Sequence, residues 1–381
     1  MLKIIKFLDR YIGSIVCRIL GIFNFFSKTD AKKINPKKIL VIQLWGIGES
    51  VLTLPAVKSL IQKFPKAGVD VLVTKRNKEV YNGIKGLNSI KKIDFSIMSI
   101  IEFVLSNFRK YDVVVDMEEY LNVSAIISFF AGKCRVGYSH GARSKIYNLK
   151  VYYDENIHVR DVFLELANSI GAEYKKEGLI QLNYNKKDRK NVDGLLKKYR
   201  ISPKIIGISP GTAESAKCRM WPYEKYAEAC NSVIEKYNAT VMFVGTEEER
   251  RLADEIIKNI EKKENAVNLC GKFSLRELFY FVTKCDVFIG NDSGAMHIAA
   301  AQKVKTIGLF GPNLPQRFSP YGKGNAAIYK GENCIFSPCI NVHKGQVPDC
   351  LYSKSGHDYQ KCMKNISVNE VVAEVEKMIE Y

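Results

Sequence analysis

Short apolar segments alternate with amphipathic ones along most of the chain, from about residue 38 onward. Glycine-rich or polar turns bound the apolar segments, which is typical of buried parallel strands. We expect such strands at 38–44, 69–73, 92–95, 113–116, 205–209, 240–244, 287–289 and 306–310. The stretch 50–64 has a helical pattern, in which Pro55 stands either in the first turn or at a kink. This alternation predicts right-handed βαβ units and therefore an α/β fold.

A polar and basic stretch at 183–204, with one amphipathic helical piece, separates two similar halves of the chain. We place the domain junction there. The expected parts are an amphipathic helix with a basic linker at 1–37, a first Rossmann-like domain at 38–185, a linker at 186–204, a second Rossmann-like domain at 205–366 and a C-terminal helix at 367–381.

In the second half, four expected strands each run directly into a loop that contains glycine. These loops are at 210–212, 245–247, 290–294 and 311–313. The carboxyl ends of parallel strands lie on one edge of a sheet, so we expect the four loops to line one ligand-binding crevice.

The first 27 residues are mostly apolar but carry internal charges, and the longest charge-free run, 19–27, is far shorter than the ~18–20 residues of a spanning helix. No cleavable signal is evident. On a helix, one narrow stripe collects Lys3, Lys6, Arg10, Ser14 and Arg18 beside a wide apolar face. The pattern favours a helix lying in the surface of an anionic membrane, followed by a basic linker. The alternative is a helix packed on the protein's own core or on a second subunit.

The chain has 381 residues, 46% hydrophobic and 26% charged, so it is neither disordered nor fibrous. Its 58 lysines and arginines against 40 aspartates and glutamates give a net charge of +18, which favours an anionic partner. Nine basic and two acidic residues in 1–38 contribute +7 of this charge. A nucleic-acid-binding module is not recognisable, so we expect no nucleic-acid partner.

Six of the ten cysteines are scattered, which fits a reducing compartment. The other four cluster late in the chain, as Cys334, Cys339, Cys350 and Cys362. Their spacing is not one of the close Cys-x2-Cys pairs of most structural zinc sites. A metal site, a disulfide and free thiols all remain open for this cluster.

The first expected strand is followed by Gly46 and Gly48, and then by Glu49 at the start of a helix. A dinucleotide-binding fingerprint would need a third glycine where Val51 stands, so a nicotinamide cofactor is disfavoured. The two glycines let the backbone approach a ligand closely. Glu49 either caps the helix or points into the crevice as a base.

The loop that opens the small-residue helix near 298–301 combines Asp292, Ser293, Gly294 and His297. The backbone N–H groups and the positive end of such a helix suit an anion such as a phosphate. Alternatively, Asp292 caps the helix and His297 is a buried core residue.

Two further loops carry groups that could hold a nucleotide. Thr212, Lys217 and Arg219 could clasp a diphosphate, or be incidental residues of a solvated loop. Glu247 could bind ribose hydroxyls, or favour the dipole of a helix start. No Asp-x-Asp pair occurs in the chain, so we expect cations and helix ends, rather than a metal, to hold a diphosphate, and we expect no cofactor.

As a set, these loops resemble glycosyltransferase family 9, the ADP-heptose:lipopolysaccharide heptosyltransferase family. The resemblance spans roughly 38–372 and is carried by the segments 39–57, 209–222, 268–301 and 307–322. It implies a GT-B fold, in which two Rossmann-like domains face across a cleft. The acceptor would bind mainly to the first domain and the nucleotide-sugar to the second.

The family resemblance also implies an inverting, metal-independent transfer. In members of the family, the catalytic base is an acid directly after the Gly-x-Gly turn, usually Asp. In this chain Glu49 holds that position. The cation two residues before Trp-Pro, usually Lys, is Arg219. The donor-loop residues match at Asp292, Ser293, Gly294 and His297, and Glu247 matches the acid on the nucleoside side.

We therefore expect a glycosyltransferase that moves a sugar, with heptose from ADP-heptose as the usual donor of the family, onto a lipopolysaccharide core or related glycolipid. It would work in the cytoplasm, peripherally at the inner face of the cytoplasmic membrane. The alternative is a catalytically silent GT-B protein that binds a glycan or a nucleotide. The sequence does not identify the sugar, the acceptor hydroxyl or the oligomeric state.

Overall fold

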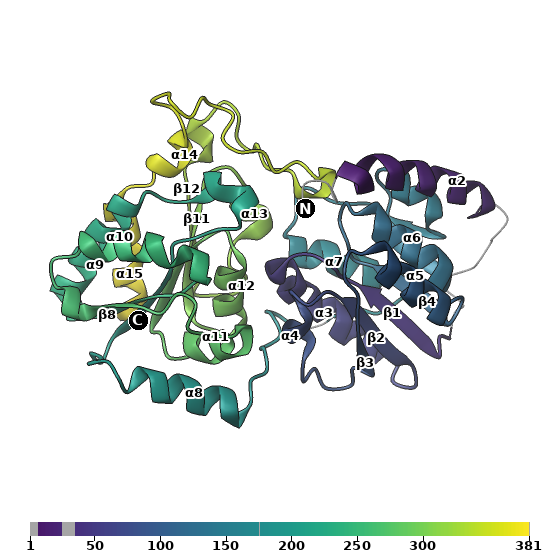
Figure 1. The fold of residues 1–381 in the computed structure, drawn as a ribbon, viewed down its shortest axis with the longest axis horizontal. Coiled ribbons are helices and arrows are strands. Elements are labelled where there is room, and N and C mark those ends of the chain that lie inside the picture. Colours follow the sequence, from purple (N-terminus) through teal and green to yellow (C-terminus); the bar gives the residue numbers. More distant parts are fainter. Residues whose placement is uncertain (1–6, 25–34, 175, 381) are drawn as a thin grey trace. The chain divides into compact units, whose positions relative to one another are not determined.

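The computed structural model describes residues 7–24, 35–174 and 176–380. Lys3, Lys6 and most of the basic linker therefore lie outside the described residues. The chain forms two compact units, the first made of residues 1–176 and 342–345, and the second of residues 177–341 and 346–381. Each unit is built around one parallel sheet with helices on both faces (Figure 1).

The sheet of the first unit has six parallel strands in the order β3-β2-β1-β4-β5-β6. The strands are β1 (Lys38–Ile42), β2 (Gly68–Val73), β3 (Ser89–Lys92), β4 (Tyr111–Asp116), β5 (Gly132–Tyr138) and β6 (Leu149–Val151). The helices between them are α3 (Ile47–Lys63), α4 (Lys78–Tyr81), α5 (Ile97–Ser106) and α6 (Asn122–Ala131), and α7 (Val159–Asn168) follows β6. The strand order reverses between β1 and β4, which is where ligands bind in sheets of this kind.

The α/β fold with parallel sheets is confirmed, while several element boundaries differ from the prediction. The expected strand at 92–95 is wrong by about three residues, because β3 begins at Ser89 and ends at Lys92. Pro55 lies inside α3, which starts at Ile47 rather than at residue 50. The strands β5 and β6 were not predicted, because lysine, arginine and glycine interrupt the apolar pattern of β5 and β6 has only three residues.

The N-terminal helical segment packs against the first unit along one side. It consists of η1 (Asp9–Gly13), a turn of π-helix, and α2 (Ser14–Asn24). The Asp9 carboxylate accepts hydrogen bonds from the backbone N–H groups of Asn122 (2.9 Å) and Val123 (2.7 Å), and so caps α6. Gly13 and Cys17 are buried on the same side, whereas large apolar residues on the other side of α2 are exposed. Among the described helices, none combines the length and the apolar character needed to cross a membrane.

The second unit repeats the architecture, with strand order β12-β11-β10-β7-β8-β9. The strands are β7 (Ile205–Ser209), β8 (Thr240–Phe243), β9 (Ala266–Asn268), β10 (Val287–Asn291), β11 (Lys305–Phe310) and β12 (Ala326–Tyr329). The main helices are α8 (Lys186–Leu196), α9 (Tyr223–Tyr237), α10 (Arg250–Lys258), α11 (Leu275–Val282), α12 (Gly294–Ala301), α13 (Pro315–Phe318), α14 (Lys361–Lys364) and α15 (Val368–Glu380).

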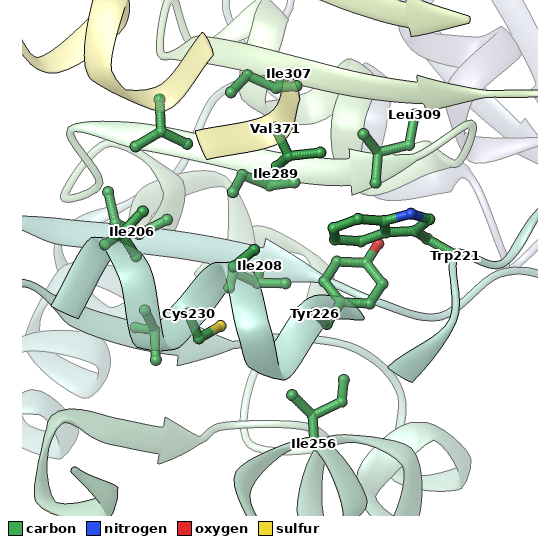
Figure 2. Close-up of a cluster of buried hydrophobic side chains, with 14 of the residues drawn as sticks. Ile206, Ile208, Trp221, Tyr226, Cys230, Ile256, Ile289, Ile307, Leu309 and Val371 are labelled. Carbon is green, nitrogen blue, oxygen red and sulfur yellow. The ribbon is translucent and has the colours of Figure 1, made fainter. Parts of the chain in front are cut away.

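The core of the second unit anchors the loop that follows β7. Trp221 ends that loop and is buried with Tyr226 of α9 against isoleucines of the central strands (Figure 2). The two rings meet edge to face, with 4.8 Å between their centroids. Val371 of α15 packs on the same cluster. The apolar side chains therefore fix both ends of the segment between β7 and α9.

The polar stretch at 183–204 forms α8, which starts with a capping box of Asn185 and Asp188. This helix belongs to the second unit and packs on α11, where Asp188 pairs with Arg276 at 2.7 Å. Residues 342–345, by contrast, belong to the first unit, although the chain before and after them belongs to the second.

Candidate active site

Glu49 lies in the first turn of α3, directly after the first strand of the sheet. Gly46 is the N-cap residue of this helix, and the Glu49 carboxylate folds back over it, so that a Cβ at position 46 would overlap Glu49 Oε2. Gly48 is buried in the same turn. Within the part of the chain that the structure describes, no hydrogen bond or ion pair holds the half-buried Glu49 carboxylate. The structure therefore offers no support for Glu49 as a helix cap, and leaves its carboxylate open to a ligand.

A buried glutamate that the sequence analysis missed supports this loop. Glu118 follows β4, and its Oε1 accepts hydrogen bonds from the backbone N–H groups of Leu44 and Trp45, the latter at 2.9 Å. The Gln43 side chain donates to the same oxygen at 3.3 Å. Burial raises the pKa of Glu118 to about 8. The backbone of the segment that leads to Gly46 is thus held by hydrogen bonds to the Glu118 carboxyl group, which lies just after β4.

A cavity of about 620 Å³ lies at the carboxyl ends of β4, β5 and β6 in the same unit. Tyr120 lines it, and burial, followed by the negative charges of Glu118 and Glu49, raises the pKa of that tyrosine. Residues of η1 and the returning segment 342–345 form other walls. The sequence analysis named none of these residues except Arg10 and Ser14, which it placed on the membrane helix.

The returning segment is held by ring and charge contacts within the first unit. The His343 ring stacks on Tyr153, with 4.4 Å between centroids, and its Nε2 lies 2.9 Å from Glu155 Oε1. Lys344 Nζ lies 3.2 Å from the same carboxylate oxygen. The cavity therefore has basic and aromatic groups on a wall supplied from far along the chain.

Arg143, one of the residues around this cavity, is buried and has one guanidinium nitrogen without a hydrogen bond among the described residues. Arg143 Nη2 lies 2.9 Å from Asp116 Oδ2, and Arg143 Nε donates to the Tyr147 hydroxyl at 2.9 Å. Its Nη1, which is also buried, has no hydrogen-bond partner among the described residues. Such a guanidinium nitrogen suits an oxygen of a polar or anionic ligand.

In the second unit, Asp292 and Arg219 are paired rather than solvated. Arg219 Nη1 lies 3.0 Å from Asp292 Oδ2 and donates to the Asp292 carbonyl at 3.3 Å. Asn313 Nδ2 donates to the same Oδ2 at 2.8 Å. Arg219 Nε is buried without a partner among the described residues. Asp292 therefore ties together the loops that follow β7, β10 and β11 instead of capping α12.

Asn291, at the end of β10, adds a second tie that the sequence analysis missed. Its Nδ2 donates to the Pro210 carbonyl at 2.8 Å, and its Oδ1 accepts from the Trp221 backbone N–H at 3.1 Å. Both ends of the 210–221 loop are therefore pinned to one buried amide. The sequence signal for this role was an asparagine at the end of an apolar strand, directly before Asp292.

The start of α12 has the features of an anion-binding site. Ser293 is its N-cap residue, yet the hydroxyl makes no cap hydrogen bond, and Oγ has no partner among the described residues. Gly294 opens the helix, and His297 is buried one turn further along. Unpaired donors at a helix N-terminus favour a negatively charged group.

Thr212 and Lys217 lie on the loop that leads to Arg219. The Thr212 hydroxyl donates to the Ala216 carbonyl at 3.0 Å, which makes it a brace of this loop. Lys217 is exposed, and its carbonyl accepts a hydrogen bond from the Gln360 side chain at 2.7 Å. The structure brings Arg219, Asp292 and the α12 start together, with Thr212 shaping the loop beside them.

In the acidic loop after β8, Glu247 points outward, whereas Glu249 contacts a neighbouring loop. Glu247 is mostly exposed and accepts hydrogen bonds from Nε and Nη2 of Arg250, at 2.5 and 2.8 Å, which lowers its pKa. Glu249 instead folds over Gly211, where a Cβ would overlap its Oε1, and burial raises its pKa. Glu249 is therefore the acid that touches the loop after β7, a contact the sequence analysis did not anticipate.

The four late cysteines come together with Cys218 around one small cavity of the second unit. All of these cysteines are free thiols. Among the described residues, no three His, Cys, Asp or Glu side chains are arranged as metal ligands.

Comparison with known proteins yields a family and a fold. The family model of glycosyltransferase family 9 (heptosyltransferase) matches residues 107–343. The chain is 26% identical to lipopolysaccharide core heptosyltransferase OpsX of Haemophilus influenzae over 295 residues, 75% of this chain and 82% of the relative. It is 25% identical to lipooligosaccharide heptosyltransferase 2 of Haemophilus ducreyi over 365 residues, 90% of this chain and 99% of the relative.

Two solved structures share the fold. A family 9 glycosyl transferase from Veillonella parvula superposes with a TM-score of 0.76 at 19% identity, over 91% of this chain and 98% of the other. The E. coli ADP-heptose lps heptosyltransferase II superposes with a TM-score of 0.69 at 20% identity, over 90% and 98%.

Proposed function

The chain belongs to glycosyltransferase family 9, and from this premise we propose that it transfers heptose from ADP-heptose to the core of a lipopolysaccharide or a related glycolipid. The names of its relatives support this donor and this class of acceptor. The observation that carries the proposal is the Glu49 carboxylate, which is folded over Gly46 and held by no hydrogen bond among the described residues.

In the proposed reaction, Glu49 accepts the proton of an acceptor hydroxyl. The acceptor oxygen then bonds to the anomeric carbon as the bond from that carbon to the diphosphate oxygen breaks. Attack from the face opposite the diphosphate inverts the anomeric configuration, and ADP leaves with the bonding electrons. A carboxylate placed at hydrogen-bond distance from the hydroxyl supplies general-base catalysis of roughly 10²–10⁴-fold.

The leaving diphosphate is bound, in this proposal, by the second unit. The α12 start offers the unpaired Ser293 Oγ and the Gly294 N–H, and the helix dipole adds positive potential. Arg219, oriented by Asp292, directs its unpaired Nε and its charge at the same group. Lys217, Thr212 and His297 complete the donor site, and an acid of the 247–249 loop binds ribose hydroxyls.

The acceptor glycan occupies the 620 Å³ cavity of the first unit in this proposal. Arg143 Nη1 supplies a buried donor for a carboxylate or phosphate of the glycan. Tyr120 lines this cavity and senses the charge of Glu49, so we propose that the acceptor hydroxyl reaches the base on the Tyr120 side of the cavity. The same unit would hold the enzyme at the inner membrane surface through the exposed apolar side of α2.

Substitution of the base tests the proposal directly. Glu49→Gln keeps the size of the side chain but removes its basicity, so we expect transfer to fall by about a thousandfold while ADP affinity, measured by calorimetry, stays unchanged. The matched control is Glu173→Gln, an exposed glutamate of the same unit, which leaves transfer unchanged. A Glu49→Gln variant that transfers heptose near the wild-type rate would contradict the assignment of the base. A wild-type protein that binds ADP-heptose but never turns it over, with any candidate acceptor, would contradict the proposed activity.

A further inference from the structure

The helix α5 exposes an unusually apolar face. Ile97, Met98 and Leu105 have 77%, 73% and 72% of their surface exposed, and Ile101 and the following Phe108 are also exposed. These residues recur at the spacing of one helix face. Only Phe103 of α5 is fully buried, in the core beneath the sheet. The helix therefore buries one stripe against the core and leaves a wider apolar stripe largely exposed.

This face is continuous with the apolar side of α2. The helix α6 lies between the two, in contact with both (Figure 1). The Phe108 ring lies 6.5 Å from Phe130 of α6, and Phe130 lies 5.3 Å from Phe129. Phe129 in turn packs with Leu20 against the small core around Cys17. We call the combined patch the α2–α5 surface, and its exposed apolar members are Leu8, Ile12, Ile15, Ile19, Ile22, Phe23, Ile97, Met98, Ile101, Leu105 and Phe108.

The charges around the α2–α5 surface are mostly positive. Exposed basic residues border it on several elements, namely Arg10, Arg18, Lys92, Arg109, Lys110 and Lys145. The acids nearby are Asp94 and Glu102, since Asp9 is turned inward to cap α6 and Asp112 pairs with Lys133 at 2.9 Å. An apolar patch with a basic border complements an anionic lipid surface. Two copies of this chain joined through the same patch would bring like charges together.

We propose that α5 is a second membrane-binding element, which inserts Ile97, Met98, Ile101, Leu105 and Phe108 into an anionic bilayer beside α2. Two helices at the interface fix the orientation of the first unit on the membrane, which a single helix does not. The cavity of that unit then meets an acceptor anchored in the same bilayer in a defined pose. This inference extends the proposed membrane location, and vesicle binding tests it without reference to transfer.

The experiment measures partition of the full-length protein onto vesicles of phosphatidylcholine with about 30% phosphatidylglycerol, by co-sedimentation in ~0.1 M salt. Leu105→Asp lowers the partition coefficient about tenfold, and Ile97→Asp with Leu105→Asp lowers it about a hundredfold, because an aspartate must be withdrawn from the interface. Both positions are exposed, so the variants fold like wild type. The matched control is Ile335→Asp, an isoleucine that is 83% exposed in the second unit, and it binds as wild type does.

Additional measurements distinguish binding to an anionic membrane from a loss of activity and from self-association. Vesicles of phosphatidylcholine alone bind the wild type much more weakly, and Arg109→Gln with Lys110→Gln removes part of that difference. Transfer to a water-soluble acceptor fragment stays unchanged in the α5 variants, so loss of vesicle binding is distinguishable from failure of the proposed activity. The proposal is overturned if the double α5 variant binds anionic vesicles as tightly as Ile335→Asp does. It is equally overturned if the variant changes only self-association in sedimentation velocity, which would make a second copy the occupant.

Discussion

The two units carry their functional residues in opposite ways. In the second unit, Asn291 and Asp292 tie the loops after β7, β10 and β11 together through buried hydrogen bonds and an ion pair. In the first unit, Glu49 has no such bond among the described residues and is positioned by the close approach of Gly46. A site that stabilises a charged leaving group binds it more strongly when its donors are already fixed in the correct orientation. A general base, by contrast, must keep a lone pair free for the proton that it accepts.

The supports behind these groups differ as well. Arg219 is held directly by a carboxylate, so removal of that carboxylate leaves a buried charge unpaired. Glu49 is held indirectly, because Glu118 supports the backbone that leads to its glycines. Substitutions in the second unit should therefore act mainly on donor affinity, and those in the first unit mainly on the chemical step. Three substitutions probe this contrast, beginning with the largest expected effect.

Asp292→Ala removes the partner of both Arg219 and Asn313. Loss of one member of a largely buried ion pair destabilises a fold by about 3–5 kcal/mol, so we expect the free energy of unfolding to fall by about this much in urea unfolding. We also expect ADP affinity, measured by calorimetry, to fall, because Arg219 is no longer oriented. Asp254→Ala, an exposed aspartate of the same unit, is the control and leaves ADP affinity unchanged. An Asp292→Ala protein that binds ADP as tightly as the control would show that the buried network is not part of the donor site.

Gly46→Ala places a Cβ where Glu49 Oε2 lies. Because displacement of a catalytic group by about an ångström can cost two orders of magnitude, we expect kcat to fall about a hundredfold with ADP affinity unchanged. Gly194→Ala is the matched control, since a Cβ there meets nothing within 4 Å. If kcat survives in Gly46→Ala, the position of Glu49 does not limit the reaction.

Glu118→Gln has the smallest expected effect on heptose transfer, and it changes the free energy of unfolding instead. Burial raises the pKa of Glu118 from the usual 4.5 to about 8, so between these values the folded chain holds a proton that the unfolded chain has released. Wild-type stability therefore falls as pH rises through that window. The glutamine variant lacks this dependence and gains about 3–4 kcal/mol relative to wild type between pH ~5 and ~8 in urea unfolding. A stability difference that does not change with pH would refute the raised pKa, and Glu173→Gln serves as the control.

The parts of the fold and site that follow from local pattern were predictable. The strand, the two glycines and the acid at 38–49 are contiguous, and so are Asp292, Ser293 and Gly294 at a helix start. Glu118 was missed because its role depends on Leu44, 74 residues away in the sequence. Asn313 and Glu249 were missed for the same reason, since their contacts are with Asp292 and Gly211 on other loops.

The exposure of α5 illustrates a different limit. Its residues 97–106 are apolar nearly all round, which is the pattern of a buried helix, and no local signal distinguishes burial in protein from burial in lipid. Only the packing of α6 beside it shows which stripe the protein covers. The short edge strands β6, β9 and β12 were also missed, because three or four residues carry too little periodicity.

The return of residues 342–345 to the first unit has a consequence for synthesis of the chain. Every strand of the second sheet is made before Val342 leaves the ribosome, because β12 ends at Tyr329. The N-terminal unit therefore cannot seat His343 on Tyr153, or finish the wall of its cavity, until the other unit has been translated. A chain stopped before residue 342 would lack this wall, and the order of translation thus ensures that the cavity of the first unit is completed only in molecules in which the second sheet has already been made.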